Sequence, residues 1–158
     1  MGDAVTAPAL RIGILTNEYP PNVYGGAGVH VEYLVQALGR LEGGAHQIDV
    51  FCFGDQREDR GNVRVRGVRP GTDLPATDPR HKKFLETMAQ DVRMAGLVSG
   101  ADVVHCHTWY SHFAGCLVRQ LDDAKLILTT HSLEPHRPWK FEQLGTAYHA
   151  STWIEETG

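Results

Sequence analysis

The sequence predicts an α/β protein with an open, mostly parallel sheet and helices on both faces. Short runs of aliphatic and β-branched residues alternate along the 158 residues with longer segments of helical spacing. The connecting segments are long enough to cross over the sheet, which favours parallel strands joined by right-handed crossovers. With 42% hydrophobic and 22% charged residues the composition is that of a globular protein. We expect a lead-in over residues 1–10 and a single domain over 11–158.

Five apolar runs predict strands, because each is rich in Val, Ile, Leu or Phe and is bounded by Gly, Pro or polar residues. They cover residues 11–16, 48–53, 63–68, 101–107 and 125–130. The run 63–68 alternates apolar and polar residues, which is typical of a half-exposed strand near a sheet edge.

Helical spacing fills the intervals between these strands. Apolar residues recur at i, i+3, i+4 and i+7 from Val31 to Leu38, which predicts a helix that begins near Val29. Pro79 is suited to the first turn of a second helix. Its expected buried stripe is Phe84, Leu85, Met88, Val92 and Ala95. Further helices are expected over residues 111–121 and within 141–154.

Charge and composition exclude several function classes. The net charge is −4 and the cations are dispersed, so we expect no nucleic-acid partner. No apolar run approaches the roughly 18 residues of a membrane span, and residues 1–10 do not resemble a secretion signal. Three cysteines without a CxxC pair fit a reducing compartment. These features predict a cytoplasmic protein with no membrane partner.

The carboxyl ends of the strands are the expected binding edge of such a sheet. With the common strand order 3-2-1-4-5, the first and fourth strands are neighbours. Gly25, Gly26 and Gly28 follow the first strand and precede a helix, where free N–H groups and the helix dipole favour an anion such as a diphosphate. A tight loop that needs positive φ angles is the structural alternative.

His105 and His107 are two residues apart on the fourth strand, so both side chains point to one side of the sheet. His107 ends the strand, which favours a binding or catalytic role, whereas His105 lies deeper and is interpreted as structural. A metal site that adds His112, His131 or Cys106 is an alternative. We expect no metal, since no third ligand has convincing spacing.

Residues 131–140 mix histidines, cations and an aromatic residue, a composition that can hydrogen-bond and stack on sugars or simply form a solvated loop. Glu18 is either an acid–base group or an exposed loop carboxylate. From the residues alone, Tyr110, Trp109 and Phe113 are expected to pack rather than to bind a ligand.

Three segments together resemble the bacterial glycogen synthases and related glucosyltransferases of families 4 and 5. They are NEYPPNVYGGAGVH at 17–30, HCHTWY at 105–110 followed by Ala114-Gly115, and THSLEPHRPWK at 130–140. Many glycogen synthases carry a lysine just before the paired glycines and a second histidine where this chain has Tyr110. The departures look like the pattern of maltose-1-phosphate synthase relatives.

The resemblance implies a GT-B glycosyltransferase with two Rossmann-like domains facing across a cleft. It implies retaining transfer of glucose from ADP-glucose or UDP-glucose to an α-1,4-glucan or related acceptor in glycogen biosynthesis, with no metal or other cofactor. By position, Gly25 and Gly26, with Gly28, approach the donor diphosphate and His107 assists the transferred sugar. Contacts to sugar or acceptor are expected from Glu18, Tyr110, His131 and Arg137.

The carboxyl-terminal nucleotide-binding domain of that family is not found in these residues, and the first domain itself is expected to be incomplete. We therefore expect this segment to be inactive alone. Two alternatives remain open at this point. One is a non-catalytic carbohydrate-binding or scaffold module with the same fold, and the other is a metal hydrolase with histidine ligands.

Overall fold

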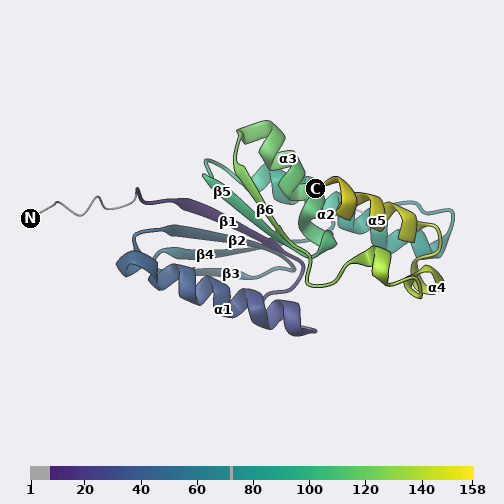
Figure 1. The fold of residues 1–158 in the computed structure, drawn as a ribbon, viewed down its shortest axis with the longest axis horizontal. Coiled ribbons are helices and arrows are strands. Elements are labelled where there is room, and N and C mark those ends of the chain that lie inside the picture. Colours follow the sequence, from purple (N-terminus) through teal and green to yellow (C-terminus); the bar gives the residue numbers. More distant parts are fainter. Residues whose placement is uncertain (1–7, 72) are drawn as a thin grey trace, which may run out of the picture.

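The computed structural model describes residues 8–71 and 73–158, and the part of the expected lead-in at residues 1–7 lies outside the described residues. Six strands form one sheet in the order β3-β4-β2-β1-β5-β6 (Figure 1). The strands are β1 (Arg11–Thr16), β2 (Gln47–Phe53), β3 (Arg57–Arg60), β4 (Val63–Val68), β5 (Val103–His107) and β6 (Lys125–Thr129). All neighbouring pairs are parallel except β3 and β4.

The five predicted strands are confirmed in the predicted order, with β1 between β2 and β5. β3 was not predicted, because its sequence Arg-Glu-Asp-Arg has no apolar residue to mark a strand. This short charged strand pairs antiparallel with β4 and forms the edge of the sheet, so β4 lies one position inside the edge. A short, charged strand is a common way to end a sheet, since it resists pairing with another chain.

Five α-helices accompany the strands among the described residues. They are α1 (Gly26–Arg40), α2 (Lys82–Leu97), α3 (Trp109–Asp122), α4 (Lys140–Leu144) and α5 (Ala147–Thr157). The helix expected within 141–154 is two helices, because Gly145 adopts a positive φ of 56° between them. In the part of the chain that the structure describes, no helix combines the length and apolar character needed to cross a bilayer.

Helices cover both faces of the sheet, as predicted. α1 packs Val31 and Val35 against one face, over a cluster that includes Ile14, Ile48 and Val50. On the other face, α2 and α3 pack over Leu15 and Cys106 (Figure 1). Burial of these apolar side chains contributes about 25 cal/mol for each Å² removed from water, and this places α1 and α3 beside the carboxyl ends of β1 and β5.

The expected apolar stripe of α2 is partly wrong. Val92 is 55% exposed, whereas Thr87, Gln90 and Asp91 are buried with Met94 and Ala95. Hydrogen bonding makes part of this polar burial possible, because the Gln90 amide donates to the Val68 carbonyl at 3.0 Å and the Thr87 hydroxyl donates to the Lys83 carbonyl at 2.8 Å. Because the face of α2 that packs on the sheet includes these polar residues, the apolar pattern of the sequence did not predict it.

Candidate functional site

A cavity of about 520 Å³ lies at the carboxyl ends of β1, β5 and β6, where the sequence predicts a site. Three loops and the start of α1 enclose it, together with the segment that leads into α4. Its lining comprises Asn17, Glu18, Gly25, Gly26, Ala27, Thr108, Trp109, Tyr110, Thr130, His131, Ser132, Glu134, Arg137 and Lys140. The cavity therefore collects side chains from residues more than 100 positions apart in the sequence.

The first wall of the cavity is the amino-terminal end of α1. Gly25 occupies the N-cap position and no side chain caps the helix. The Glu18 carboxylate instead accepts the N–H groups of Tyr24 and Gly25, both at 2.9 Å, and so holds the loop before the helix. The first-turn N–H groups from Gly26 onward have no intrahelical partners, as at any helix start. Together with the helix dipole they favour the binding of an anion.

Gly28 lies in the first turn of α1 and is buried. A Cβ atom at this position would lie 2.9 Å from side-chain atoms of both Glu18 and Val23. The glycine therefore lets α1 approach the loop that Glu18 organises, and Gly28 does not line the cavity.

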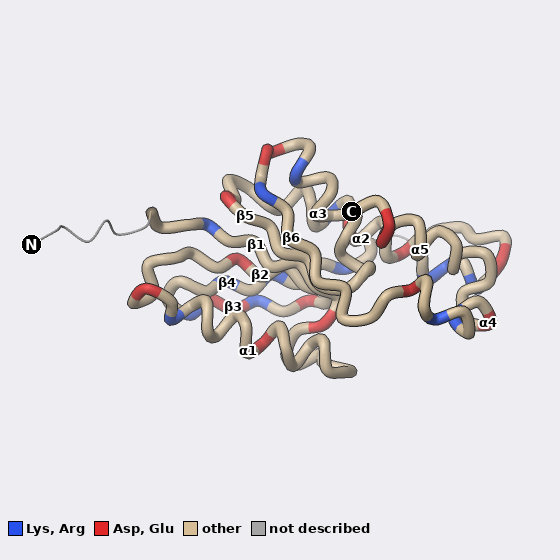
Figure 2. The backbone as a smooth tube through the Cα atoms, viewed as in Figure 1, with Lys and Arg blue, Asp and Glu red and all other residues tan. Residues whose placement is uncertain are grey.

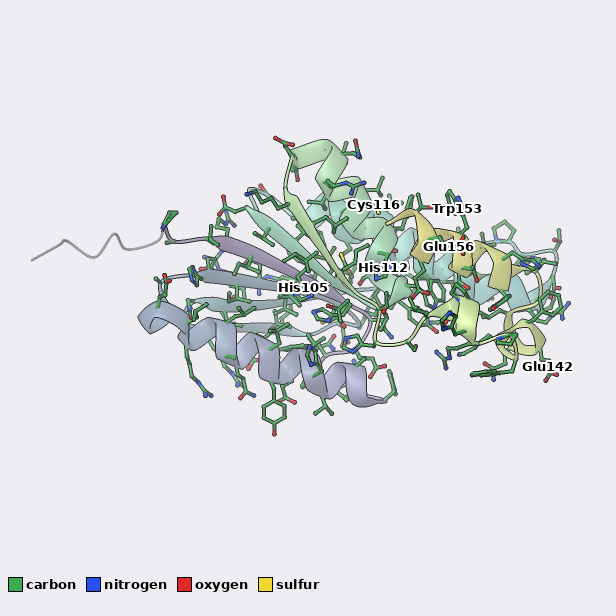
Figure 3. All side chains as sticks on the ribbon, viewed as in Figure 1. His105, His112, Cys116, Glu142, Trp153 and Glu156 are labelled. Atoms are coloured by element: carbon green, nitrogen blue, oxygen red, sulfur yellow. The ribbon has the colours of Figure 1, made fainter. Side chains whose placement is uncertain are left out.

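Four histidines form the second wall and its support. His107 Nδ1 lies 3.0 Å from His131 Nε2, a hydrogen bond between two imidazoles. The ring of His30, from α1, lies 5.0 Å from that of His131 and 5.7 Å from that of His107. The ring centroid of His105 lies 4.1 Å from that of His107. His105 Nε2 forms a hydrogen bond with the Thr129 hydroxyl at 2.8 Å. Figure 3 shows His105 among the strands.

His131 is exposed and lines the cavity, whereas His107 is fully buried behind it. Burial, reinforced by the neighbouring histidines, lowers the pKa of His107 to about 3 and also lowers the pKa of His105. Partial desolvation, together with His30, lowers the pKa of His131. His107 is thus a neutral imidazole near neutral pH. A neutral His107 can fix the tautomer and orientation of His131 through its Nδ1.

The same three residues, His30, His107 and His131, are the described residues that could hold a metal ion, since one nitrogen from each lies within 4.8 Å of the others. Three imidazole nitrogens are a ligand set that suits zinc. The set differs from the one weighed from the sequence, because His105 is engaged by Thr129 and His30 comes from α1.

Two residues beside the cavity have a positive φ, a backbone conformation that residues other than glycine rarely adopt. Thr108 has φ 63° and His131 has φ 58°. Thr108 donates its hydroxyl to the Asn17 side chain at 2.9 Å and its N–H to Thr129 at 2.8 Å, which ties the three strand ends together. Positive φ at non-glycine residues costs of order 1–3 kcal/mol and tends to occur at functional sites.

The third wall brings cations to the cavity. Arg137 lies 3.3 Å from the buried Glu134 carboxylate and donates to the Ser132 hydroxyl at 3.2 Å. Lys140 begins α4 beside it. Burial, with Glu134 adding to it, raises the pKa of Tyr110. The Tyr110 hydroxyl therefore stays protonated and can donate a hydrogen bond into a cavity that also offers two cations.

Comparison with known proteins identifies the family. The sequence model of Glycosyltransferase Family 4 matches residues 24–157, most of the chain. The chain belongs to glycosyltransferase family 4.

The curated relatives of this family 4 chain include α-maltose-1-phosphate synthase of Mycobacterium tuberculosis, 47% identical over 94% of the chain and 35% of the relative. Glycogen synthase of the same species is 27% identical over 92% of the chain and 40% of the relative. The chain thus spans about a third of the length of the maltose-1-phosphate synthase that it matches.

Solved structures share the fold of the family 4 chain. The catalytic domain of starch synthase IV from Arabidopsis thaliana, bound to ADP and acarbose, matches with a TM-score of 0.57 at 18% identity, over 80% of the chain and 34% of that structure. Sucrose-phosphate synthase from Thermosynechococcus elongatus matches with a TM-score of 0.59 at 18% identity, over 94% and 39%. The fold is that of the GT-B glycosyltransferases, as the sequence motifs implied.

Most of the site residues predicted from the sequence meet in this family 4 cavity. Those that line it are Glu18, Gly25, Gly26, Tyr110, His131 and Arg137. Gly28 and His107 lie behind its surface. Lys140 was weighed from the sequence, with Arg137, either as a phosphate partner or as an unpaired cation. His30 and Glu134 were quoted within motifs but given no role. The order of loops around a parallel sheet could have indicated Glu134, whereas His30 reaches the site only through the packing of α1.

Proposed function

We propose that this chain forms one wall of the cleft of a retaining glucosyltransferase, which moves glucose from ADP-glucose or UDP-glucose to a sugar phosphate. The observation that carries the proposal is the cavity in which the uncapped start of α1, His131 and two cations converge. Membership of family 4 supports the reaction class, and the 47% identical maltose-1-phosphate synthase supports the acceptor class. Maltose 1-phosphate is a glucosyl unit joined to glucose 1-phosphate, so a sugar phosphate is the acceptor that such a product needs.

On the donor side, the proposed role of α1 is to stabilise the charge of the leaving group. As the bond to the transferred glucose breaks, negative charge develops on the leaving nucleoside diphosphate. The N–H groups of the first turn of α1 would stabilise this charge without reorganisation, since they are already oriented. Gly26, without a side chain, lets the diphosphate approach the backbone closely, and no atom lies within 4 Å of the place a Cβ would take. Gly25 and Gly28 shape the loop for this contact.

We assign the sugar contact to His131, which would hydrogen-bond the transferred glucose. His107 acts through His131, because its Nδ1 faces that ring and its side chain is buried. His107 is in this proposal a positioning residue for the sugar contact. Glu18 likewise acts on the site by holding the Tyr24 and Gly25 N–H groups.

On the acceptor side, Arg137 and Lys140 would bind the phosphate of a sugar phosphate, and Tyr110 would bond one of its hydroxyls. An arginine fork matches phosphate oxygens in geometry and charge. A neutral glucan offers no such anion, so the two cations favour the sugar phosphate. The glucan remains the second candidate acceptor, since glycogen synthase is among the relatives.

A chimera tests the proposal. Residues 8–158 would replace the segment they match in the Mycobacterium tuberculosis maltose-1-phosphate synthase. Radiolabelled ADP-glucose and UDP-glucose would each be offered with glucose 1-phosphate or with a maltooligosaccharide. We expect an α-linked product from glucose 1-phosphate. Transfer to the oligosaccharide alone would overturn the acceptor, and a folded chimera without transfer from either donor would favour a non-catalytic module.

Paired variants of the chimera test the cations. Arg137→Ala with Lys140→Ala should raise the KM for glucose 1-phosphate at least tenfold. Arg119→Ala, which removes an exposed cation of α3 outside the cavity, is the matched control and should leave this KM within about twofold. An equal KM in all three proteins would show that the acceptor phosphate binds elsewhere.

A further inference from the structure

A second concave region lies on the sheet face opposite α1, away from the cavity described above. It consists of two adjoining hollows of about 290 and 560 Å³, which share Arg57 and Leu97 in their walls. β1, β2 and β4 form the floor, and the end of α2 forms one wall. None of its lining residues belongs to the lining of the family 4 cavity.

Arginines dominate this region, which we call the arginine groove. Six of the eleven arginines of the chain line it, although the net charge of the chain is −4. They are Arg11, Arg57, Arg64, Arg66, Arg69 and Arg93. Several of them come from the strands β3 and β4, where Figure 2 shows basic segments.

The strand register places these cations side by side. Arg57 of β3 lies directly opposite Arg66 of β4, so both side chains extend from the same face of the sheet. Arg64 extends from that face as well, two residues before Arg66. Like charges directly opposite each other destabilise a strand pair. Asp59 lies opposite Arg64 in the register, and its carboxylate pairs with Arg66.

Carboxylates neutralise only part of this charge. Arg11 pairs with Asp49 at 3.3 Å, Arg66 with Asp59 at 2.8 Å and Arg69 with Asp55 at 2.5 Å. Over residues 8–71 and 73–158, no carboxylate lies within 4.0 Å of the guanidinium groups of Arg57, Arg64 or Arg93. The groove therefore holds three unneutralised cations on one face.

Apart from Asp49, which pairs with Arg11, the floor beneath the cations is apolar. Phe51 lies in the centre of the sheet, and Leu97 and Val98 come from the end of α2. A concave apolar surface with a few polar groups is typical of a binding site for an organic ligand. The apolar floor therefore favours an organic anion as the ligand.

We propose that the arginine groove binds a small phosphorylated molecule, with its phosphate between Arg57, Arg64 and Arg66 and its organic part over Phe51 and Leu97. A phosphate dianion relieves the repulsion between the opposed guanidinium groups and accepts paired N–H bonds from them. The proposed phosphate position lies in the first hollow, beside the amino-terminal half of β1, whereas the second hollow reaches Gly54 and Val68 at the carboxyl ends of β2 and β4. Neither hollow shares a lining residue with the family 4 cavity, so the ligand of the groove is separate from donor and acceptor. The proposal does not depend on the proposed function.

Nuclear magnetic resonance on the ¹⁵N-labelled chain tests this assignment, with inorganic phosphate and phenyl phosphate as probes. We expect saturable shifts of the Arg57 and Arg64 side-chain Nε–H signals and of the Gly13 and Ser99 amides. Phenyl phosphate should bind more tightly than inorganic phosphate because of the apolar floor. Shifts confined to the first turn of α1 would overturn the proposal, and equal affinity for the two probes would overturn the role of the floor.

A charge-matched pair of variants separates a built site from general electrostatic attraction. Arg57→Ala with Arg64→Ala should weaken phenyl phosphate binding at least tenfold. Arg40→Ala with Arg119→Ala removes the same charge from exposed positions on α1 and α3 and should leave binding within about twofold. Equal weakening in the two variants, or none in the first, would refute the site. Circular dichroism would verify that both variants are folded.

Discussion

In the proposed function, His131 and His107 share the sugar contact that the resemblance implies for His107 alone. His131 presents its ring to the cavity, and His107 holds that ring from a fully buried position at the end of β5. If the two act as one unit, removing either should cost nearly as much as removing both.

In the chimeric enzyme, we expect His131→Ala and His107→Ala each to lower kcat/KM by about 10²-fold or more. The double variant should be little worse than the more damaging single one. His136→Ala, at an exposed position outside the cluster, serves as the control and should stay within about twofold. Additive losses in steady-state kinetics would show that His107 has a role of its own.

The sequence predicted those site residues that come soon after the carboxyl end of a parallel strand. Tyr110 and His131 follow strands β5 and β6 directly, so the rule for carboxyl ends finds them. The burial of His107 and the contact of Glu18 with Gly25 depend on side-chain packing across the loops, and no spacing in the sequence encodes it.

At the scale of secondary structure, strands rich in β-branched residues were predicted within two residues at each end. α1 begins at Gly26 rather than near Val29. The prediction missed its first turn because glycines there give no apolar periodicity. α2 buries Gln90 and Asp91, which an apolar pattern cannot reveal. Helix existence was thus predictable, whereas the buried face of α2 was not.

Two helical glycines test how closely α3 is packed. A Cβ at Gly115 would lie 2.3 Å from Cys106 Sγ and 2.7 Å from Leu126, whereas one at Gly96 of α2 would meet nothing within 4 Å. Overpacking typically costs about 1–3 kcal/mol, so Gly115→Ala should lower the free energy of unfolding by that amount.

Gly96→Ala is the matched control and should raise the free energy of unfolding by about 0.4–1 kcal/mol, because alanine restricts the unfolded chain. Urea denaturation measures both variants. A Gly115→Ala variant as stable as the parent chain would mean that β5 and α3 can separate without loss.

On the scale of the whole molecule, the helices leave part of each face of the sheet uncovered. α1 packs over β1, β2 and β4 on one face, and α2 and α3 pack over β1, β2 and β5 on the other. The arginine groove lies beside the end of α2, and on the opposite face Ile127 of β6 is 48% exposed. The sequence could predict two faces but not how far each helix extends across them.

The buried histidines make the stability of the fold depend on pH. The pKa of His107 is lowered to about 3 and that of His112 to about 4, mainly by burial, and an unfolded histidine titrates near 6.5. Between these values the unfolded chain binds protons that the folded chain does not. The free energy of unfolding should therefore fall as the pH drops from about 6.5 to 4, by at most about 1.4 kcal/mol per pH unit for each histidine.

His107→Gln should flatten this dependence, and His136→Gln should not. Urea denaturation at several pH values between 4 and 7 compares the slopes of the two variants with that of the parent chain. Asp91, whose pKa burial raises well above its usual range, contributes a slope of opposite sign that is common to all three proteins. An unchanged slope in His107→Gln would contradict a buried, neutral His107.

The last prediction is that the 158-residue chain, tested as a separate polypeptide, shows no measurable glucosyl transfer. Holding two reactants in position can lower a barrier by roughly 7–11 kcal/mol, and the cavity here has the wall formed by α1, β5 and β6 alone. Hydrogen bonds from the start of α1 to a diphosphate contribute only about 0.5–1.5 kcal/mol each where water competes. Affinity for ADP-glucose should accordingly be millimolar or weaker, near 4 kcal/mol of binding free energy. A radiolabelled transfer assay with the chimera as positive control, together with a titration of ADP-glucose, measures both. Sustained turnover or micromolar affinity in the separate chain would show that this one wall suffices for catalysis.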